Sequence, residues 1–246
     1  MYRNTFLSVM FLACCFNGSL CAQSDAQIYE RTCDAKTYPF SDPSPVATPN
    51  NSYYPYFRFD GFSMQAQEKQ WKMVVLENDY VKLTVTPEIG GKIWGAIDKV
   101  NNKEFVYTNG VVKFRDVAMR GPWTSGGIEF NFGIIGHAPT CSTPIDYLTK
   151  KNVDGSVSCH IFSYEWITRT VWNVEINLPK DKAYFTTHTT WFNQSSIDQP
   201  YYQWMNAGYA TKTGTRFYYP GTYSIGHSGD LHPYPIDEEG RDVSWY

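Results

Sequence analysis

Residues 79–90 read DYVKLTVTPEIG, and the order of their side chains decides the fold class. Three apolar residues, the first of them Val81, alternate with the polar residues Lys82, Thr84 and Thr86. Successive side chains of a β-strand point to opposite faces of a sheet, so this period of two predicts a strand with one buried face. The segment therefore indicates a sheet that covers a core.

The chain continues in further short segments of the same kind, separated by turn signals. They comprise two strands within 92–108 around Asn101-Asn102, a strand at 156–165 after Asp154-Gly155, and a hairpin at 171–195 that turns at Pro179–Lys182. No window of ten residues or more has the apolar spacing of a helix. Strands at short intervals with little helix between them predict an all-β fold, an antiparallel sandwich or barrel.

Composition limits the classes of function. The chain has 246 residues, of which 42% are hydrophobic, and this suits one large globular domain. The formal net charge is −3 and no basic run occurs, which argues against a nucleic-acid partner. Aromatic residues make up 17% of the chain, and their flat rings suit strands as well as stacking on the C–H faces of sugars.

Residues 1–22 predict a secretory signal peptide. Arg3 precedes an apolar run from Phe6 to Phe16, and Ala22 supplies a small residue for cleavage. A lipoprotein signal at Leu12–Cys14 is the alternative, in which case a lipidated cysteine would attach the chain to a membrane. We therefore expect a secreted or periplasmic bacterial protein, with a lipoprotein as the alternative.

The remainder divides into two parts. Residues 23–52 are rich in Asp, Ser, Pro, Thr and Asn without periodicity, and they predict an irregular lead-in. Residues 53–246 form the β-sandwich domain. Because DEEGRDVSWY at the end of the chain resembles the entry to another strand, we expect this domain to be incomplete at its C-terminus.

The cysteines outside the signal peptide leave two alternatives open. Export permits a disulfide between Cys141 and Cys159, whereas buried free thiols are equally consistent with the sequence, and Cys33 completes the set. No spacing of Cys and His matches a zinc site. We expect no metal and no other cofactor.

Residues 120–140, RGPWTSGGIEFNFGIIGHAPT, combine the aromatics of a strand with five glycines and two prolines. Glycine lets a backbone approach a ligand closely or adopt positive φ. Glu129 and Asn131 alternate with Ile128 and Phe130, so the two polar side chains face the same side of their strand. The two side chains suit the hydroxyl groups of a ligand. The alternative is that they lie on a solvated face of the strand.

Several segments together resemble a known family. LENDYVKLTVTPEIGGKIWGAIDKVNNKEFVY at 76–107, the Arg-Gly-Pro-Trp segment at 120–140, IDY at 145–147 and YYQWMNAGYA at 201–210 are similar to galactose-mutarotase-like proteins. They most resemble the bacterial family known as domain of unknown function 5107. The resemblance runs from about Tyr53 to the C-terminus and rests on the order of the motifs.

The resemblance implies an antiparallel β-supersandwich whose concave face holds a carbohydrate. True mutarotases carry a His acid before a Tyr-Phe-Asn strand, and alignment of that strand with WMNA places Tyr202 where the His would be. The general base of the family is a Glu on a late strand, which would fall beyond Tyr246. Mutarotase activity itself is therefore not carried over to this chain.

The candidate site residues have two kinds of role. Glu129 and His137 are candidate catalytic residues, because a carboxylate and an imidazole can each exchange a proton with a sugar. The candidates for binding are polar groups that bond hydroxyls and rings that stack on sugars: Arg120, Trp123, Asn131, Trp204 and Asn206. For each of them an ordinary packing or surface role is the alternative.

These observations favour a secreted domain that binds, and in one version processes, oligo- or polysaccharides. Three versions remain open: a glycosidase or epimerase, a non-catalytic glycan-binding module, and a structural β-domain without a ligand. A glycosidase requires two carboxyl groups at a defined separation, which a sequence does not reveal. Carbohydrate is the expected partner, with no nucleic acid and with membrane association only through a lipidated N-terminus.

Overall fold

The computed structural model describes residues 24–40, 61–116, 122–133, 136–165, 168–226 and 228–245. The predicted signal peptide at 1–22 and residues 41–52 of the predicted lead-in lie outside these ranges. Within them the strands are β1 (Gln27–Tyr38), β2 (Gln67–Glu77), β3 (Val81–Thr86), β4 (Lys92–Asp98), β5 (Lys103–Val106), β6 (Val112–Lys113), β7 (Arg115–Asp116), β8 (Pro122–Trp123), β9 (Ile128–Gly133), β10 (Asp146–Lys151), β11 (Val157–Glu165), β12 (Thr170–Leu178), β13 (Thr186–Asn193), β14 (Tyr202–Ala207), β15 (Tyr223–Ile225) and β16 (Leu231–Pro233). The single turn of helix among the described residues is η1 (Pro139–Cys141).

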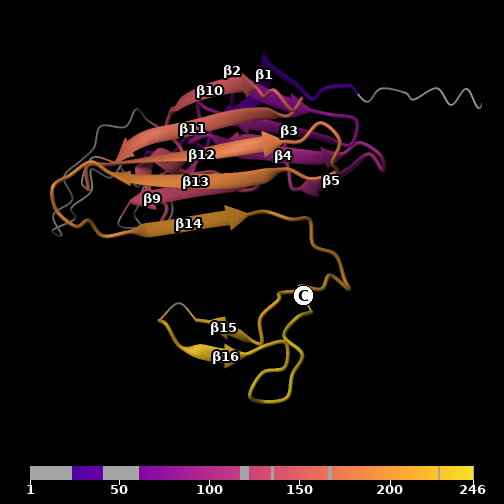
Figure 1. Ribbon diagram of the computed structural model, residues 1–246, viewed down its shortest axis with the longest axis vertical. Coiled ribbons are helices and arrows are strands. Elements are labelled where there is room, and N and C mark those ends of the chain that lie inside the picture. The colour runs from indigo at the N-terminus through magenta and orange to yellow at the C-terminus, as the bar shows by residue number, and fades with distance from the viewer. Residues whose placement is uncertain are drawn as a thin grey trace, which may run out of the picture.

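Two sheets lie against each other in layers (Figure 1). The larger has the order β14-β9-β4-β3-β2-β1-β6, with β5 also paired to β4, and the smaller has the order β10-β11-β12-β13. Neighbouring strands are antiparallel, apart from the parallel contact of β1 with β6. The prediction of an all-β antiparallel sandwich is confirmed.

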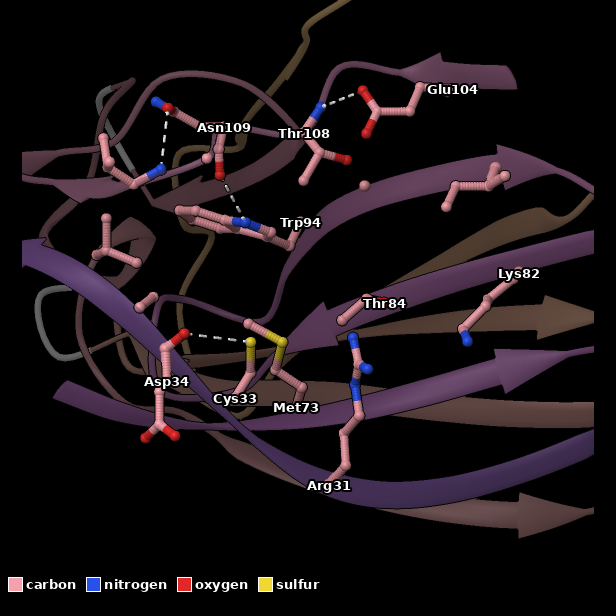
Figure 2. Close-up of a pocket in the computed structure, with 16 residues that line it drawn as sticks. Arg31, Cys33, Asp34, Met73, Lys82, Thr84, Trp94, Glu104, Thr108 and Asn109 are labelled. Atoms are coloured by element: carbon pink, nitrogen blue, oxygen red, sulfur yellow. Dashed lines mark hydrogen bonds between the residues drawn. The ribbon is translucent and has the colours of Figure 1, made fainter. Parts of the chain in front are cut away.

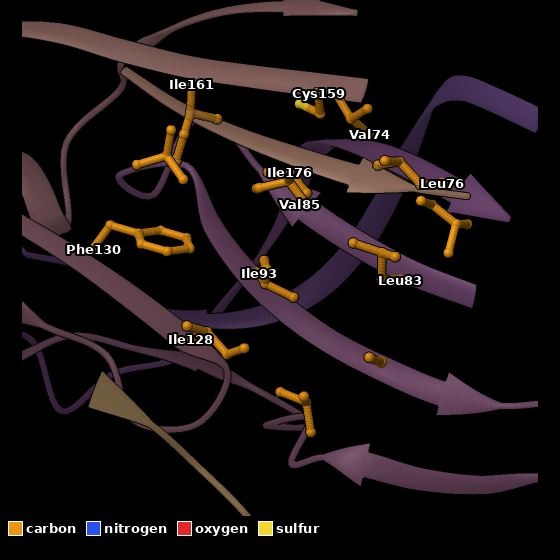
Figure 3. Packing of buried hydrophobic residues seen from close by; sticks show 14 of the residues in the cluster. Val74, Leu76, Leu83, Val85, Ile93, Ile128, Phe130, Cys159, Ile161 and Ile176 are labelled. Atoms are coloured by element: carbon orange, nitrogen blue, oxygen red, sulfur yellow. The ribbon is translucent and has the colours of Figure 1, made fainter. Parts of the chain in front are cut away.

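The core fills the space between these two sheets. Val81, Leu83 and Val85 of β3 point into it, as their alternation predicted, and they meet residues of β11 and β12 such as Ile161 and Ile176. Figure 3 shows aliphatic side chains from both sheets meeting in this layer. Because every second residue of a strand is buried here, each intervening residue lies on the other face of its sheet.

The other face of the large sheet, here called the outer face, is also partly buried. A second apolar cluster lies there, formed by Trp71, Met73, Ile89, Trp94, Val112 and Phe114. Polar residues also lie on this face, among them Lys82 and Thr84 of β3, which alternate with core residues. The outer face is the part of the fold that carries the candidate site.

The prediction of an irregular lead-in at 23–52 is wrong for the part that the structure describes. β1 pairs with β2 without interruption from Gln27 opposite Glu77 to Thr37 opposite Gln67. Most side chains of β1 are exposed or half-buried and many are charged, so the apolar alternation that reveals a strand is absent. Backbone hydrogen bonds to β2, rather than apolar burial, define this strand.

The last part of the described chain forms a small separate sheet. β15 and β16 pair antiparallel, and Figure 1 shows them at the C-terminal end, apart from the two layers. Within the described residues, no helix is long and apolar enough to cross a membrane.

Candidate functional site

β9 presents two polar side chains on the outer face of the large sheet. Ile128, Phe130 and Phe132 enter the core, so Glu129 and Asn131 point the other way, as their alternation predicted. Their burial differs from a solvated strand face, however, because only 2% of Glu129 and none of Asn131 is exposed. A carboxylate removed from water in this way must be compensated by hydrogen bonds.

β14 adds two further side chains to the same place. It pairs with β9 so that Asn206 lies opposite Glu129 and Trp204 lies opposite Asn131. The amide of Asn206 donates a hydrogen bond of 3.4 Å to Oε1 of Glu129, and the indole N–H of Trp204 donates to Oδ1 of Asn206. Trp204 and Asn206 are two residues apart on β14, so their side chains lie on the same side of the strand.

His137 reaches the same carboxylate from the loop that follows β9. Its Nδ1 lies 3.2 Å from Oε1 of Glu129, and 19% of its side chain is exposed. The ring lies beside two indoles, with centroids 6.3 Å from Trp123 and 5.7 Å from Trp204. The backbone of His137 has a φ of 53°, a left-handed conformation that is uncommon for residues other than glycine. Such conformations are held in place by the surrounding structure and gather at functional sites.

Asn131 connects this loop to the strand. Its amide donates a hydrogen bond of 2.6 Å to Oε1 of Glu129, while its own carbonyl oxygen accepts one of 3.0 Å from the backbone N–H of Ala138. Asn131 therefore fixes the position of the loop immediately after His137.

The two oxygens of the Glu129 carboxylate have different surroundings. Oε1 interacts with Asn131, Asn206 and His137, whereas Oε2 is buried and has no hydrogen-bond partner among the described residues. The indole nitrogen of Trp123 is likewise buried without a partner in the described part of the chain. An acceptor and a donor that are both unpaired require an explanation in a folded protein, such as a water molecule or a ligand.

Lys92 is a member of this site that the sequence did not reveal. It belongs to β4, it is 1% exposed, and its ammonium donates to the carbonyl oxygen of Thr124 and, at 3.1 Å, to the hydroxyl of the same residue. Burial lowers the pKa of Lys92, while the negative charge of Glu129 acts in the opposite direction. Its Nζ also lies 5.9 Å from the centre of the Trp123 ring. The one available signal was a lysine inside the apolar run IGGKIWGAI.

Cys33, Cys141 and Cys159 form no disulfide with one another, so of the two alternatives left by the sequence, the one with thiols holds. Cys33 is half-buried, and Cys141 and Cys159 are buried. Burial and the charge of Glu129 raise the pKa of Cys141 well above its ordinary value, with Lys92 acting against them. Cys141 therefore remains protonated beside the site and is a poor nucleophile.

Residues 48–246 match the family described as domain of unknown function DUF5107. The chain belongs to this family. It is also similar to the crystal structure of a TPR-domain containing protein from Parabacteroides distasonis, with 25% sequence identity and a TM-score of 0.73. That match covers 82% of this chain and 35% of the other, so the chain spans about a third of the length of that protein.

Two glycines in the 120–140 segment of this DUF5107 domain approach protein rather than an open cleft. A Cβ on Gly127, whose φ is 66°, would lie 2.3 Å from the carbonyl oxygen of Ile93 in β4. A Cβ on Gly136 would lie 3.0 Å from the ring of Trp204. These glycines bring β9 and the His137 loop against β4 and β14, and so they assemble the site indirectly.

The structure thus brings together six of the seven predicted site residues. Trp123, Glu129, Asn131, His137, Trp204 and Asn206 form one connected group, and Arg120 lies outside the described residues. No group of three or more His, Cys, Asp or Glu side chains in the described ranges is arranged to hold a metal ion.

Proposed function

We propose that this DUF5107 domain is a carbohydrate-active domain of the galactose-mutarotase-like type, and that a sugar binds at the Glu129–His137 site. The observation that carries this proposal is the unpaired pair of polar atoms, Oε2 of Glu129 and the indole nitrogen of Trp123. A hydroxyl group both donates and accepts a hydrogen bond, so sugar hydroxyls can satisfy atoms of both kinds.

The aromatic residues of the site fit the same ligand class. The rings of Trp123 and Trp204 both lie beside the ring of His137, and both residues are partly exposed. Aromatic rings stack on the apolar C–H faces of pyranoses, while polar neighbours bond the hydroxyls at the ring edge. A site built from indoles, amides and a carboxylate suits a neutral glycan.

The catalytic version of the proposal assigns proton transfer to His137. Glu129 contacts its Nδ1, while Nε2 has no hydrogen-bond partner among the described residues. A carboxylate on one ring nitrogen fixes the orientation and tautomer of an imidazole, so that the other nitrogen can exchange a proton with a ligand. This chemistry is what an epimerase or a glycosidase requires of an acid or base.

The non-catalytic version rests on a different observation. Three groups already bind Oε1 of Glu129, and the residue is almost completely buried, as expected of a polar framework that holds Trp204 and His137 in position. In this version the domain binds a glycan without turnover.

A ligand-free structural domain is the third version. For all three we propose export, on the basis of residues 1–22.

The test compares the chain with its Glu129→Gln variant. A glycan array measures affinity, and release of reducing sugar together with the rate of anomer equilibration measures turnover. The catalytic version predicts that Glu129→Gln abolishes turnover and keeps affinity within about tenfold, or 1.4 kcal/mol. Glycan binding by the wild type without any turnover supports the module, and absence of binding to the whole array contradicts the proposal.

The matched control is Glu175→Gln. Glu175 lies on β12 in the small sheet, with Oε1 3.8 Å from Nε2 of His160, so it is also a carboxylate beside an imidazole. We expect this variant to keep both affinity and turnover. Equal losses in the two variants would indicate general destabilisation.

A further inference from the structure

A separate pocket lies on the outer face of the large sheet, over β1 to β4. Its volume is about 360 Å³, within the range of about 300–1,000 Å³ that is usual for small-molecule sites. Figure 2 shows its lining residues, which come from these strands, from Glu104 of β5 and from the segment between β5 and β6 together with the start of β6. None of the predicted site residues around Glu129 is among them.

One wall of this pocket is fixed by direct contact with β4. A Cβ on Gly95 would lie 1.9 Å from Oγ1 of Thr108. The segment that follows β5 therefore crosses β4 at a position where β4 has no side chain. The indole N–H of Trp94 donates a hydrogen bond of 3.2 Å to the carbonyl oxygen of Asn109, whose own amide donates one of 2.8 Å to Ser125. The wall is therefore held in place without a ligand.

The pocket has an apolar floor and a cationic side. Met73 and Trp94 are 4% and 6% exposed and form part of the floor. Arg31 of β1 and Lys82 of β3 both line the pocket, and Figure 2 shows the guanidinium of Arg31 directed toward Thr84. Two cations that face one space create a local positive potential.

Two acidic residues, Asp34 and Glu104, also line the pocket. Asp34 accepts a hydrogen bond from Gln70 at 3.3 Å, and Figure 2 shows its carboxylate turned away from Arg31. Glu104 accepts one from the backbone N–H of Thr108 at 3.5 Å. The Arg31 guanidinium forms no ion pair with any carboxylate of the described residues.

Lys82 has a partner, but it shares that partner with others. Its Nζ lies 3.6 Å from Glu77, whose carboxylate also binds Lys99 at 2.7 Å and the hydroxyl of Tyr29 at 3.0 Å. The ammonium of Lys82 can therefore also interact with an anion in the pocket.

We propose that this pocket binds a small ring-shaped carboxylate, with a hexuronic acid as the representative ligand. A guanidinium binds a planar carboxylate through two parallel hydrogen bonds, and the Met73–Trp94 floor accepts the apolar face of a ring. Thr84 also lines the pocket, and its hydroxyl can bond a ring hydroxyl. This proposal does not depend on the function of the Glu129 site.

Cys33 provides a reporter inside the pocket. It lines the pocket, it is half-buried, and its thiol contacts the carbonyl oxygen of Asp34. Cys141 and Cys159 are buried, and burial raises the pKa of both thiols, to about 12 for Cys159, so they react slowly with alkylating reagents. Occupation of the pocket should shield Cys33 selectively.

The experiment measures alkylation of Cys33 by uncharged iodoacetamide, with peptide mass spectrometry to read that cysteine alone. At constant ionic strength, we expect glucuronate at about 10 mM, tenfold above a millimolar Kd, to slow the reaction at least about fivefold. Glucose and acetate at the same concentration, which lack the carboxylate and the ring respectively, should protect much less. Equal protection by glucose would overturn the anionic class of ligand, and no protection by glucuronate would overturn the site.

Two variants assign the effect to Arg31. Arg31→Gln removes an exposed side chain and should preserve the fold, and we expect it to weaken protection by glucuronate at least about tenfold in apparent Kd. Arg169→Gln makes the same change in charge in the turn between β11 and β12 and should leave protection unchanged. Protection that survives Arg31→Gln contradicts the proposal, and circular dichroism of both variants verifies the fold.

Discussion

Nδ1 of His137 lies 3.2 Å from Oε1 of Glu129, and the contact joins an irregular loop to the centre of a sheet. The loop is bound a second time at the next residue, because the N–H of Ala138 donates to the Asn131 side chain. Glu129 and Asn131 are two residues apart on β9, so the same buried strand carries the carboxylate that contacts His137 and the amide that binds Ala138. The position of the imidazole is thus determined by β9.

We predict that Gly127→Ala destabilises the domain more than an ordinary glycine substitution. Both Gly127 and Gly214 have positive φ, at 66° and 88°, and a left-handed conformation costs a residue with a Cβ about 1–3 kcal/mol. Gly127 alone also has a carbonyl oxygen 2.3 Å from the new Cβ, whereas nothing lies within 4 Å at Gly214. Urea denaturation should show a greater loss for Gly127→Ala than for Gly214→Ala, and equal losses would contradict the close approach to β4.

Local patterns in the sequence predicted those strands whose two faces have different surroundings. β3 and β12 alternate between core and partly exposed positions, and their sequences alternate in the same way. β1 has little apolar burial on either face, so its residues gave no such signal although its backbone is paired along its length. Hydrogen bonding of the backbone does not depend on side-chain type and leaves no pattern to read.

The candidate site was predictable in its parts but not in its assembly. Alternation predicted that Glu129 and Asn131 share one side of their strand, because this relation is local to the strand. The pairing of β9 with β14 joins residues far apart in the chain, and spacing along the sequence does not determine it. Lys92 was missed because a lysine on a strand usually indicates solvent, and a buried one is recognised only with its partner Thr124.

If Trp204 stacks on a sugar, we predict that Trp204→Ala lowers glycan affinity by about tenfold, which is 1.4 kcal/mol. The control is Trp245→Ala, since Trp245 is 52% exposed and packs against Arg216 in the C-terminal segment. Calorimetric titration with a glycan that the wild type retains on an array measures both. An unchanged affinity in Trp204→Ala removes the stacking role from the proposal.

The buried thiol of Cys159 predicts a loss of stability at alkaline pH. Its pKa is raised by burial from 9.0 to about 12, so above pH 9 the unfolded chain releases a proton that the folded chain keeps. The folded state then binds more protons, and stability falls as pH rises from about 9 to about 12. By about pH 10.5 the loss should reach about 2 kcal/mol, at 1.36 kcal/mol per pH unit.

Cys159→Val tests this effect with a side chain of similar size. The variant should lose less stability than the wild type between about pH 8 and about pH 10.5, as measured by urea denaturation at each pH. Identical pH profiles for the two proteins would show that Cys159 ionises as readily in the fold as in the unfolded chain.

Lys92 should show the opposite dependence on pH. Burial lowers the pKa of Lys92 below 10.5. Between that lowered pKa and 10.5, the unfolded chain therefore binds more protons at this residue than the folded chain does. The contribution of Lys92 to the free energy of unfolding then rises with pH. Lys92→Met keeps the length of the side chain but leaves the carbonyl oxygen and hydroxyl of Thr124 without their donor, which should cost about 1–3 kcal/mol at neutral pH. Because the variant lacks the titrating group, the difference in stability between the wild type and the variant should increase further as the pH approaches 10.5.

The control is Lys36→Met, which removes an exposed lysine from β1. It should cost little stability and show no such divergence with pH. A wild-type advantage over Lys92→Met that shrinks with rising pH would mean that the Lys92 ammonium is stabilised in the fold, with the charge of Glu129 outweighing burial.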